Sequence, residues 1–188
     1  MPSFPNLLHA FLSDQLSSSN SEGHIDLDED EDLLEGISPI SVYHLAVTSF
    51  YAPSDPSSIC GMCCEQIRST PSWWSAGPHH DYVFVVKKQN EHGFQGMSVI
   101  HIKLFFSFRY EGEEYPCALI EWFKKDSRSP NEQTGMWVVK PEEDCHGERL
   151  MTVVHLDTIL QGAHLIPIYS SSFIPPHFCH TWSLDAFM

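Results

Sequence analysis

The chain has 188 residues, of which 42% are hydrophobic, and it carries a formal net charge of −15 at pH 7. No stretch approaches the ~20 consecutive apolar residues of a membrane span, and the N-terminus lacks the basic region of a signal peptide. All ten Lys and Arg lie from Arg68 onward, which is unfavourable for contacts with nucleic-acid phosphates. We therefore expect an intracellular protein, nuclear or cytoplasmic, that binds no membrane and, by itself, no nucleic acid.

The first 38 residues are predicted to form a tail. Residues 4–16, FPNLLHAFLSDQL, place Phe and Leu on one side of a short amphipathic helix. Residues 17–36 are dominated by serine and acidic residues, which repel one another and bury little, so this segment is predicted to be disordered. It is interpreted as a solvated linker, with an acidic partner-binding or activation segment as the alternative.

Residues 39–188 are predicted to form one β-rich domain. Runs rich in Val, Ile, Phe, Trp and Tyr alternate with Gly, Pro and charged clusters. Strands are expected within 40–53, 81–88, 96–112, 114–123, 134–139 and 163–169, and residues 150–160 are expected to hold a strand and a single helical turn. Residues 60–70, CGMCCEQIRST, are predicted to form a short helix that Pro71 helps to end. This pattern predicts a mainly β fold with α+β character at its margins, in the form of a small β-barrel of SH3 or BAH type.

The cysteines suggest one possible metal site. Cys60 and Cys63 have the CxxC spacing that can hold zinc or cycle as a redox pair. A structural zinc ion requires four ligands, and Cys145 with His146 is a candidate second pair. The redox reading lacks the surrounding βαβ pattern. The favoured interpretation is that the six cysteines are ordinary thiols without a cofactor, and a zinc-stabilised binding module is the alternative.

No catalytic motif is present in the sequence. It has no GxSxG elbow, no HExxH and no P-loop. His101, His155 and His164 lie in apolar surroundings, where a hydrogen-bonded, half-buried histidine is expected. A small enzyme with a Cys–His pair remains a further alternative, because such partners meet only in space. Trp73 and Trp74 lie in a loop containing Pro and Gly. The favoured interpretation is that they pack against the barrel, and the alternative is an exposed aromatic pair that binds a peptide or a methylated lysine.

A series of segments from about Ile40 to Phe187 points to a family. The chain contains, in this order, SFYAPSDPSSICGMCCEQIRSTPSWW, DYVFV, LFFSFRYEGEEYPCALIEWF, TGMWVVKPEED and VVHLDTILQGAHLIPIY. This series resembles the C-terminal region of proteins encoded by basidiomycete transposons of the Plavaka type, which are relatives of the CACTA elements. In such proteins a longer N-terminal part would carry a metal-dependent nuclease domain, and that part is absent here.

The resemblance implies an accessory or remnant domain that is not an enzyme and uses no cofactor. At most it would be a protein-interaction module with an unidentified protein partner. The family would be expected to continue beyond residue 188, so the domain is expected to be truncated there. Self-association is expected through the apolar residues near this end, which are Ile174, Phe178, Trp182, Leu184 and Phe187.

Overall fold

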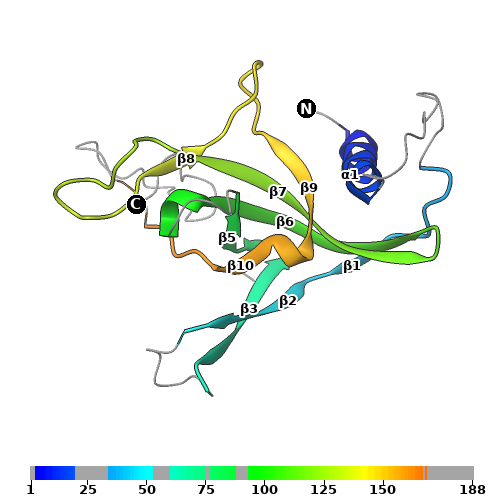
Figure 1. The fold of residues 1–188 in the computed structure, drawn as a ribbon, viewed down its shortest axis with the longest axis horizontal. Coiled ribbons are helices and arrows are strands. Elements are labelled where there is room, and N and C mark those ends of the chain that lie inside the picture. Colours follow the sequence, from blue (N-terminus) through cyan, green and yellow to red (C-terminus); the bar gives the residue numbers. More distant parts are fainter. Residues whose placement is uncertain are drawn as a thin grey trace.

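The computed structural model describes residues 3–19, 34–52, 60–74, 77–87, 93–166 and 168. Within these residues the protein is mainly β with antiparallel sheets, as the sequence predicts (Figure 1). The elements are α1 (Phe4–Ser19), β1 (Ser41–Tyr43), β2 (Leu45–Tyr51), β3 (Met62–Thr70), β4 (His79–His80), β5 (Tyr82–Val86), η1 (Gly93–Gly96), β6 (Met97–Tyr110), β7 (Glu113–Lys125), β8 (Val139–Pro141), β9 (Met151–His155), η2 (Leu156–Thr158) and β10 (Ile159–Gly162).

The larger sheet has the strand order β10-β5-β6-β7-β8, with β1 also paired to β6 and β9 also paired to β7. The smaller sheet has the order β2-β3-β4. The expected closure into a barrel is wrong, because β9 and β10 are joined through η2 but do not pair with each other in the described part of the chain. One edge of β10 pairs with β5. On this strand, the backbone groups of Leu160 and Gly162 form hydrogen bonds with side chains of β2 and β3 instead of with β9.

The β6–β7 hairpin is the long central element of the fold. Glu111 and Gly112 both have positive φ, at 51° and 87°, which matches the two-residue turn that best joins twisted antiparallel strands. Ile102 pairs with Ile120 and Leu104 with Leu119, so Lys103 is the extra residue of a β-bulge. Because side chains alternate along a strand, this bulge exchanges the two faces of β6.

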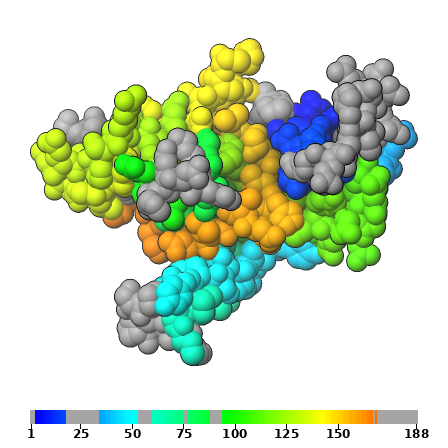
Figure 2. Space-filling model, viewed as in Figure 1, coloured from blue at the N-terminus to red at the C-terminus, as the bar shows by residue number. Residues whose placement is uncertain are grey.

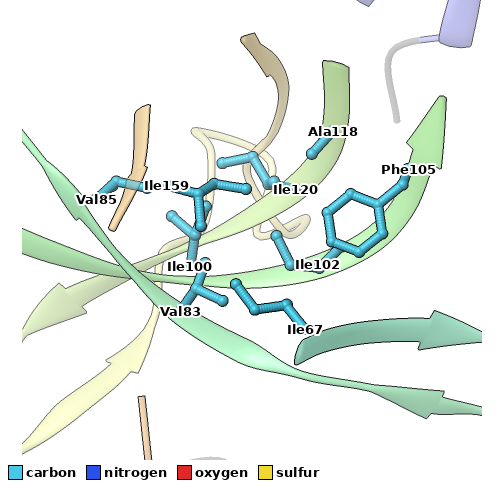
Figure 3. Close-up of a cluster of buried hydrophobic side chains, with 9 residues drawn as sticks. All are labelled: Ile67, Val83, Val85, Ile100, Ile102, Phe105, Ala118, Ile120 and Ile159. Atoms are coloured by element: carbon cyan, nitrogen blue, oxygen red, sulfur yellow. The ribbon is translucent and has the colours of Figure 1, made fainter. Parts of the chain in front are cut away.

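The main core lies where β5, β6, β7, β10 and β3 meet (Figure 3). Before the bulge, Ile100 and Ile102 point into this core, and after it Phe105 does. Because of the bulge, side chains from both halves of β6 contribute to the same core. The buried members are Ile67, Val83, Val85, Ile100, Ile102, Phe105, Ala118, Ile120 and Ile159.

Helix α1 packs on the sheet beside β9 (Figure 1). Leu8, Phe11 and Leu12 are buried against Phe106 and Phe108, which lie on the other face of β6 from the main core. The helix expected at 4–16 is therefore confirmed. The expected boundary near residue 39 does not separate it from the domain, because its apolar side shares a core with the strands.

The prediction of a helix over residues 60–70 is wrong. Met62–Thr70 forms strand β3, in which residues 62–68 pair with β2 and residues 69–70 pair with β4. The hairpin places Ile67 against the core and leaves the opposite face exposed, an alternation that a helix could not provide. Tertiary pairing here outweighs local propensity.

Two expectations fall outside the described residues. The predicted disorder of 17–36 concerns mainly residues 20–33, and the apolar C-terminal residues (Ile174, Phe178, Trp182, Leu184 and Phe187) lie beyond residue 168. Among the described residues, no helix has the length and apolar character needed to cross a membrane.

Candidate functional site

The candidate site is a hollow of about 300 Å³, here called the histidine pocket. Its walls come from β3, from β4 and β5, from His101 of β6, and from residues 162–165. The register of two strand pairs assembles it: Ser69 faces His80 across β3 and β4, and Tyr82 faces His101 across β5 and β6. Residues far apart in the sequence thus converge because neighbouring strands place facing side chains on the same side of a sheet.

A network of polar groups adjoins the pocket through Tyr82 and His101, which line it. His101 Nδ1 donates to the Glu121 carboxylate over 3.0 Å, and Lys103 Nζ lies 3.5 Å from the other carboxylate oxygen. The Tyr82 ring stacks on the His101 ring with centroids 4.4 Å apart. The expectation of a hydrogen-bonded histidine at position 101 is confirmed, although the residue is buried and not half-buried as expected.

The charges of this network shift its pKa values. Burial alone would raise the pKa of Glu121, but the hydrogen bond from His101 and the charge of Lys103 hold it below its usual value. Burial, with His101 and Lys103 as neighbours, lowers the pKa of His80 to about 4. Burial, assisted by the negative Glu121, raises the pKa of Tyr82 to about 12. His80 and Tyr82 are therefore both neutral at pH 7.

Ser69 and His80 invite comparison with a nucleophile–base pair, since Ser69 Oγ and His80 Nδ1 are 2.8 Å apart. Three observations oppose that reading. Ser69 is only 2% exposed, so a substrate could not reach its hydroxyl. A histidine with a pKa near 4 is a poor base at neutral pH, and the carboxylate of the network is bonded to His101 instead. The pair holds β3 to β4.

Asp81 connects the pocket, through hydrogen bonds, to the side chains that surround Trp73. Its carboxylate accepts hydrogen bonds from the backbone N–H of Arg68 over 2.7 Å and from His79 Nε2 over 2.8 Å. The His79 ring in turn lies 5.6 Å from the Trp73 ring, and the Arg68 guanidinium lies 5.0 Å from the same ring. Trp73 is therefore fixed between groups that also line the pocket.

Trp73 and Trp74 form the tryptophan rim, with ring centroids 6.2 Å apart in an edge-to-face arrangement. The backbone N–H of Trp73 donates to the carbonyl of Gly77, which closes the loop. Trp74 is 85% exposed and has a φ of 50°, a conformation that bulky side chains rarely adopt. The structure thus brings the two tryptophans predicted from the sequence together and presents one of them to solvent.

The four candidate zinc ligands do not come together. Cys60 lies in the turn before β3 and Cys63 on β3, whereas Cys145 and His146 lie in the β8–β9 loop, which projects from the opposite side of the molecule (Figure 1). Throughout the described residues, no three His, Cys, Asp or Glu side chains are grouped so that they could hold a metal ion.

Two of the described thiols, Cys64 and Cys117, lie in contrasting surroundings. Cys64 Sγ lies 3.3 Å from Ser49 Oγ on the exposed face of the hairpin. Cys117 is buried, and that burial raises the pKa of its thiol to about 12. A catalytic cysteine instead needs a lowered pKa and access to solvent.

The sequence provided a signal for the rim but not for the pocket. Adjacent tryptophans in a loop are visible locally, whereas Ser69 meets His80 and Glu121 meets His101 only through strand register. Comparison of the chain with protein-family models, curated proteins and solved structures found no match, so any functional conclusion comes from its own residues.

Proposed function

We propose that this chain is a non-catalytic protein-interaction module that binds a peptide segment of a partner protein at the tryptophan rim and the adjoining histidine pocket. The observation that carries the proposal is Trp74, which is 85% exposed while held at positive φ. Such a conformation costs about 1–3 kcal/mol, and leaving a large apolar side chain in water forgoes roughly another 1.5–3 kcal/mol. A partner that covers the ring would recover the hydrophobic free energy, and the backbone cost would remain.

The chemistry of the rim favours a ligand that carries a cationic side chain. Trp73 already accepts the guanidinium of Arg68 on its ring, and Trp74 offers a second indole face to solvent. The net charge of the chain, −15, would attract a basic segment and repel an acidic one. Tryptophan is also among the residues that most often dominate binding energy at protein interfaces.

This function agrees with the family resemblance. In a protein of the Plavaka type, the module would accompany a separate nuclease region, and its task would be to hold a partner protein. The polar network around His101 would then support the shape of the pocket and would take no part in a reaction.

The test uses an array of synthetic peptides with varied sequences that contain unmodified or trimethylated lysine. The wild-type chain, Trp74→Ala and Val86→Ala are compared on it, the last as a control because Val86 is exposed on β5 outside the rim and the pocket. We expect lysine-containing peptides to bind the wild type and the control equally and to bind Trp74→Ala at least about tenfold more weakly. Equal binding to all three proteins, or no binding above background, would refute the proposal.

A stability measurement separates loss of binding from loss of folding. Trp74→Gly removes the ring and also suits the positive φ, so its free energy of unfolding should equal or exceed that of the wild type. A destabilised Trp74→Gly would mean that the ring supports the fold and is not displayed for a partner.

A further inference from the structure

Strand β2 has an edge that is open for pairing. In the described residues it pairs only with β3 and is the outer strand of its sheet. One backbone hydrogen bond lies at each end of the β2–β3 ladder. The N–H of Ala52 donates to the carbonyl of Gly61, and the N–H of Ser69 donates to the carbonyl of His44. Hydrogen-bonded and non-hydrogen-bonded pairs alternate in an antiparallel ladder. Even-numbered residues of β2 therefore point their backbone groups at β3, and the odd-numbered ones point theirs at the open edge.

The residues with outward backbone groups also have exposed side chains. They are Leu45, Val47, Ser49 and Tyr51. None is charged, and the strand contains neither proline nor lysine, which are the usual devices that protect an edge from further pairing. Figure 2 shows the hairpin, coloured cyan to teal, extending away from the body of the molecule. This edge is therefore unprotected and accessible within the described part of the chain.

A hollow of about 420 Å³ lies along the same strand. It is lined on one side by residues 46–49 of β2 and on the other by Leu156, Asp157 and Ile159. Asp157 is the only charged residue of this lining, and its side chain is 88% exposed. The hollow thus combines apolar and hydroxyl-bearing side chains with one negative charge at its margin.

We propose that the β2 edge binds an extended segment of a partner protein as an added β-strand. Backbone hydrogen bonds to the odd-numbered residues would supply affinity, one apolar side chain would enter the hollow, and a Lys or Arg would face Asp157. Charge complementarity favours this occupant over a second copy of the chain, because β2 has no basic residue to offer Asp157 and each copy carries a charge of −15. The edge is a different surface from the tryptophan rim, and the proposal does not depend on binding there.

The probe is a synthetic peptide of about ten residues, the length of a long strand, in which Thr and Val alternate between terminal lysines. Its affinity for the full chain is measured by NMR titration of the backbone amides. We expect the largest shifts at Leu45, Val47, Ser49 and Tyr51. A peptide of the same sequence with alternate backbone amides methylated should bind at least about tenfold more weakly, because strand addition depends on these groups. Equal affinity of the two peptides would overturn the proposal.

Variants test the same edge from the side of the protein. Val47→Pro deletes an edge-facing N–H without removing a hydrogen bond to β3, and Val47→Thr is the matched control that keeps the N–H. We expect the proline variant to lose at least about tenfold in affinity and the threonine variant less than about threefold. Should Val47→Pro fail to fold by circular dichroism, the comparison of methylated and unmethylated peptides decides the question.

Charge and independence are tested with two further variants. Asp157→Asn should weaken binding of the lysine-flanked peptide more than binding of a glutamine-flanked one, and an equal effect on both would contradict the role of Asp157. Trp74→Ala should leave the affinity for the strand peptide unchanged, which distinguishes this site from the tryptophan rim. Absence of peptide binding together with dimerisation that Val47→Pro abolishes would identify a second copy as the occupant and refute the proposal.

Discussion

Glu65 on β3 accepts a hydrogen bond of 2.7 Å from the backbone N–H of Gly162 on β10, 97 residues further along the chain. The residue opposite Glu65 on the hairpin, Thr48, donates one of 2.6 Å to the carbonyl of Leu160. Two facing side chains thus provide the donor and the acceptor that a neighbouring strand would otherwise provide. Because of these two hydrogen bonds, the backbone groups of Leu160 and Gly162 have partners although β10 does not pair with β9.

Gly162→Ala should destabilise the protein. A Cβ at this position would lie 2.6 Å from Glu65 Oε1, closer than real contacts allow. Either the carboxylate moves and loses its hydrogen bond or the hairpin shifts, and such overpacking costs about 1–3 kcal/mol. Urea denaturation followed by circular dichroism measures the change in the free energy of unfolding.

The control for this prediction is Glu65→Ala, which removes the obstructing carboxylate. In that background, Gly162→Ala should cost at least about 1 kcal/mol less than in the wild type, since residues in contact show coupling of this size. If the cost is the same in both backgrounds, the close approach of Glu65 is not what requires a glycine at 162.

Leu12→Ala tests whether helix α1 belongs to the folded domain. The Leu12 side chain has no exposed surface and packs in the cluster that contains Phe106 and Phe108. Removing it should lower the free energy of unfolding by about 2–5 kcal/mol. Asn6→Ala, on the exposed side of the same helix, is the control and should change stability by less than about 0.5 kcal/mol. Equal, small effects would mean that the helix is dispensable.

The strands with strong local patterns could be predicted from the sequence. The segments that form β6 and β7 combine aliphatic and aromatic residues over 14 and 13 residues, and the turn at Gly112 separates them. The helical turn between β9 and β10 was also predicted correctly. Strand β3 was not, because nothing in residues 60–70 reveals that β2 will pair with them. The open sheet depends on the contact between Glu65 and Gly162, which no local pattern encodes.

The candidate site was only half predictable for the same reason. Trp73 and Trp74 are neighbours in the sequence, so an aromatic surface could be inferred directly. The histidine pocket instead depends on the registers that set Ser69 against His80 and Tyr82 against His101. A one-residue slip of either pair would turn these side chains to the opposite face, and sequence patterns do not fix register to a single residue.

His80 makes the stability of the fold depend on pH. Its folded pKa of about 4 lies below the ordinary value of 6.5, so between these values the unfolded chain binds more protons than the folded one. Stability should therefore decrease as the pH falls from about 6.5 to about 4. Glu121, whose pKa is also lowered, adds a further loss as the pH falls through its folded pKa.

Thermal melts across this pH range provide the measurement. His80→Asn cannot titrate, so its melting temperature should fall less between pH 6.5 and 4 than that of the wild type. His146→Asn, in the exposed β8–β9 turn, should retain the wild-type dependence. Parallel curves for His80→Asn and the wild type would show that His80 is not the group responsible.

Cys117 should be unreactive in the folded protein and reactive after unfolding. Its side chain is buried against the apolar face of helix α1, and burial raises the pKa of the thiol to about 12. Only the thiolate attacks disulfide reagents, so at pH 8 a group with this pKa reacts roughly four orders of magnitude less than a full thiolate. Exposed thiols such as Cys64 do not share this protection.

Titration with Ellman's reagent, before and after denaturation, separates the two classes. Cys117→Ala should leave the native titre unchanged and lower the denatured titre by one thiol per chain, whereas Cys64→Ala should lower both. The opposite result, a fast native reaction that disappears in Cys117→Ala, would mean that position 117 carries an accessible, activated thiolate. That outcome would favour a Cys–His enzyme over a binding module, because an activated cysteine has no use in a fold that only holds a partner.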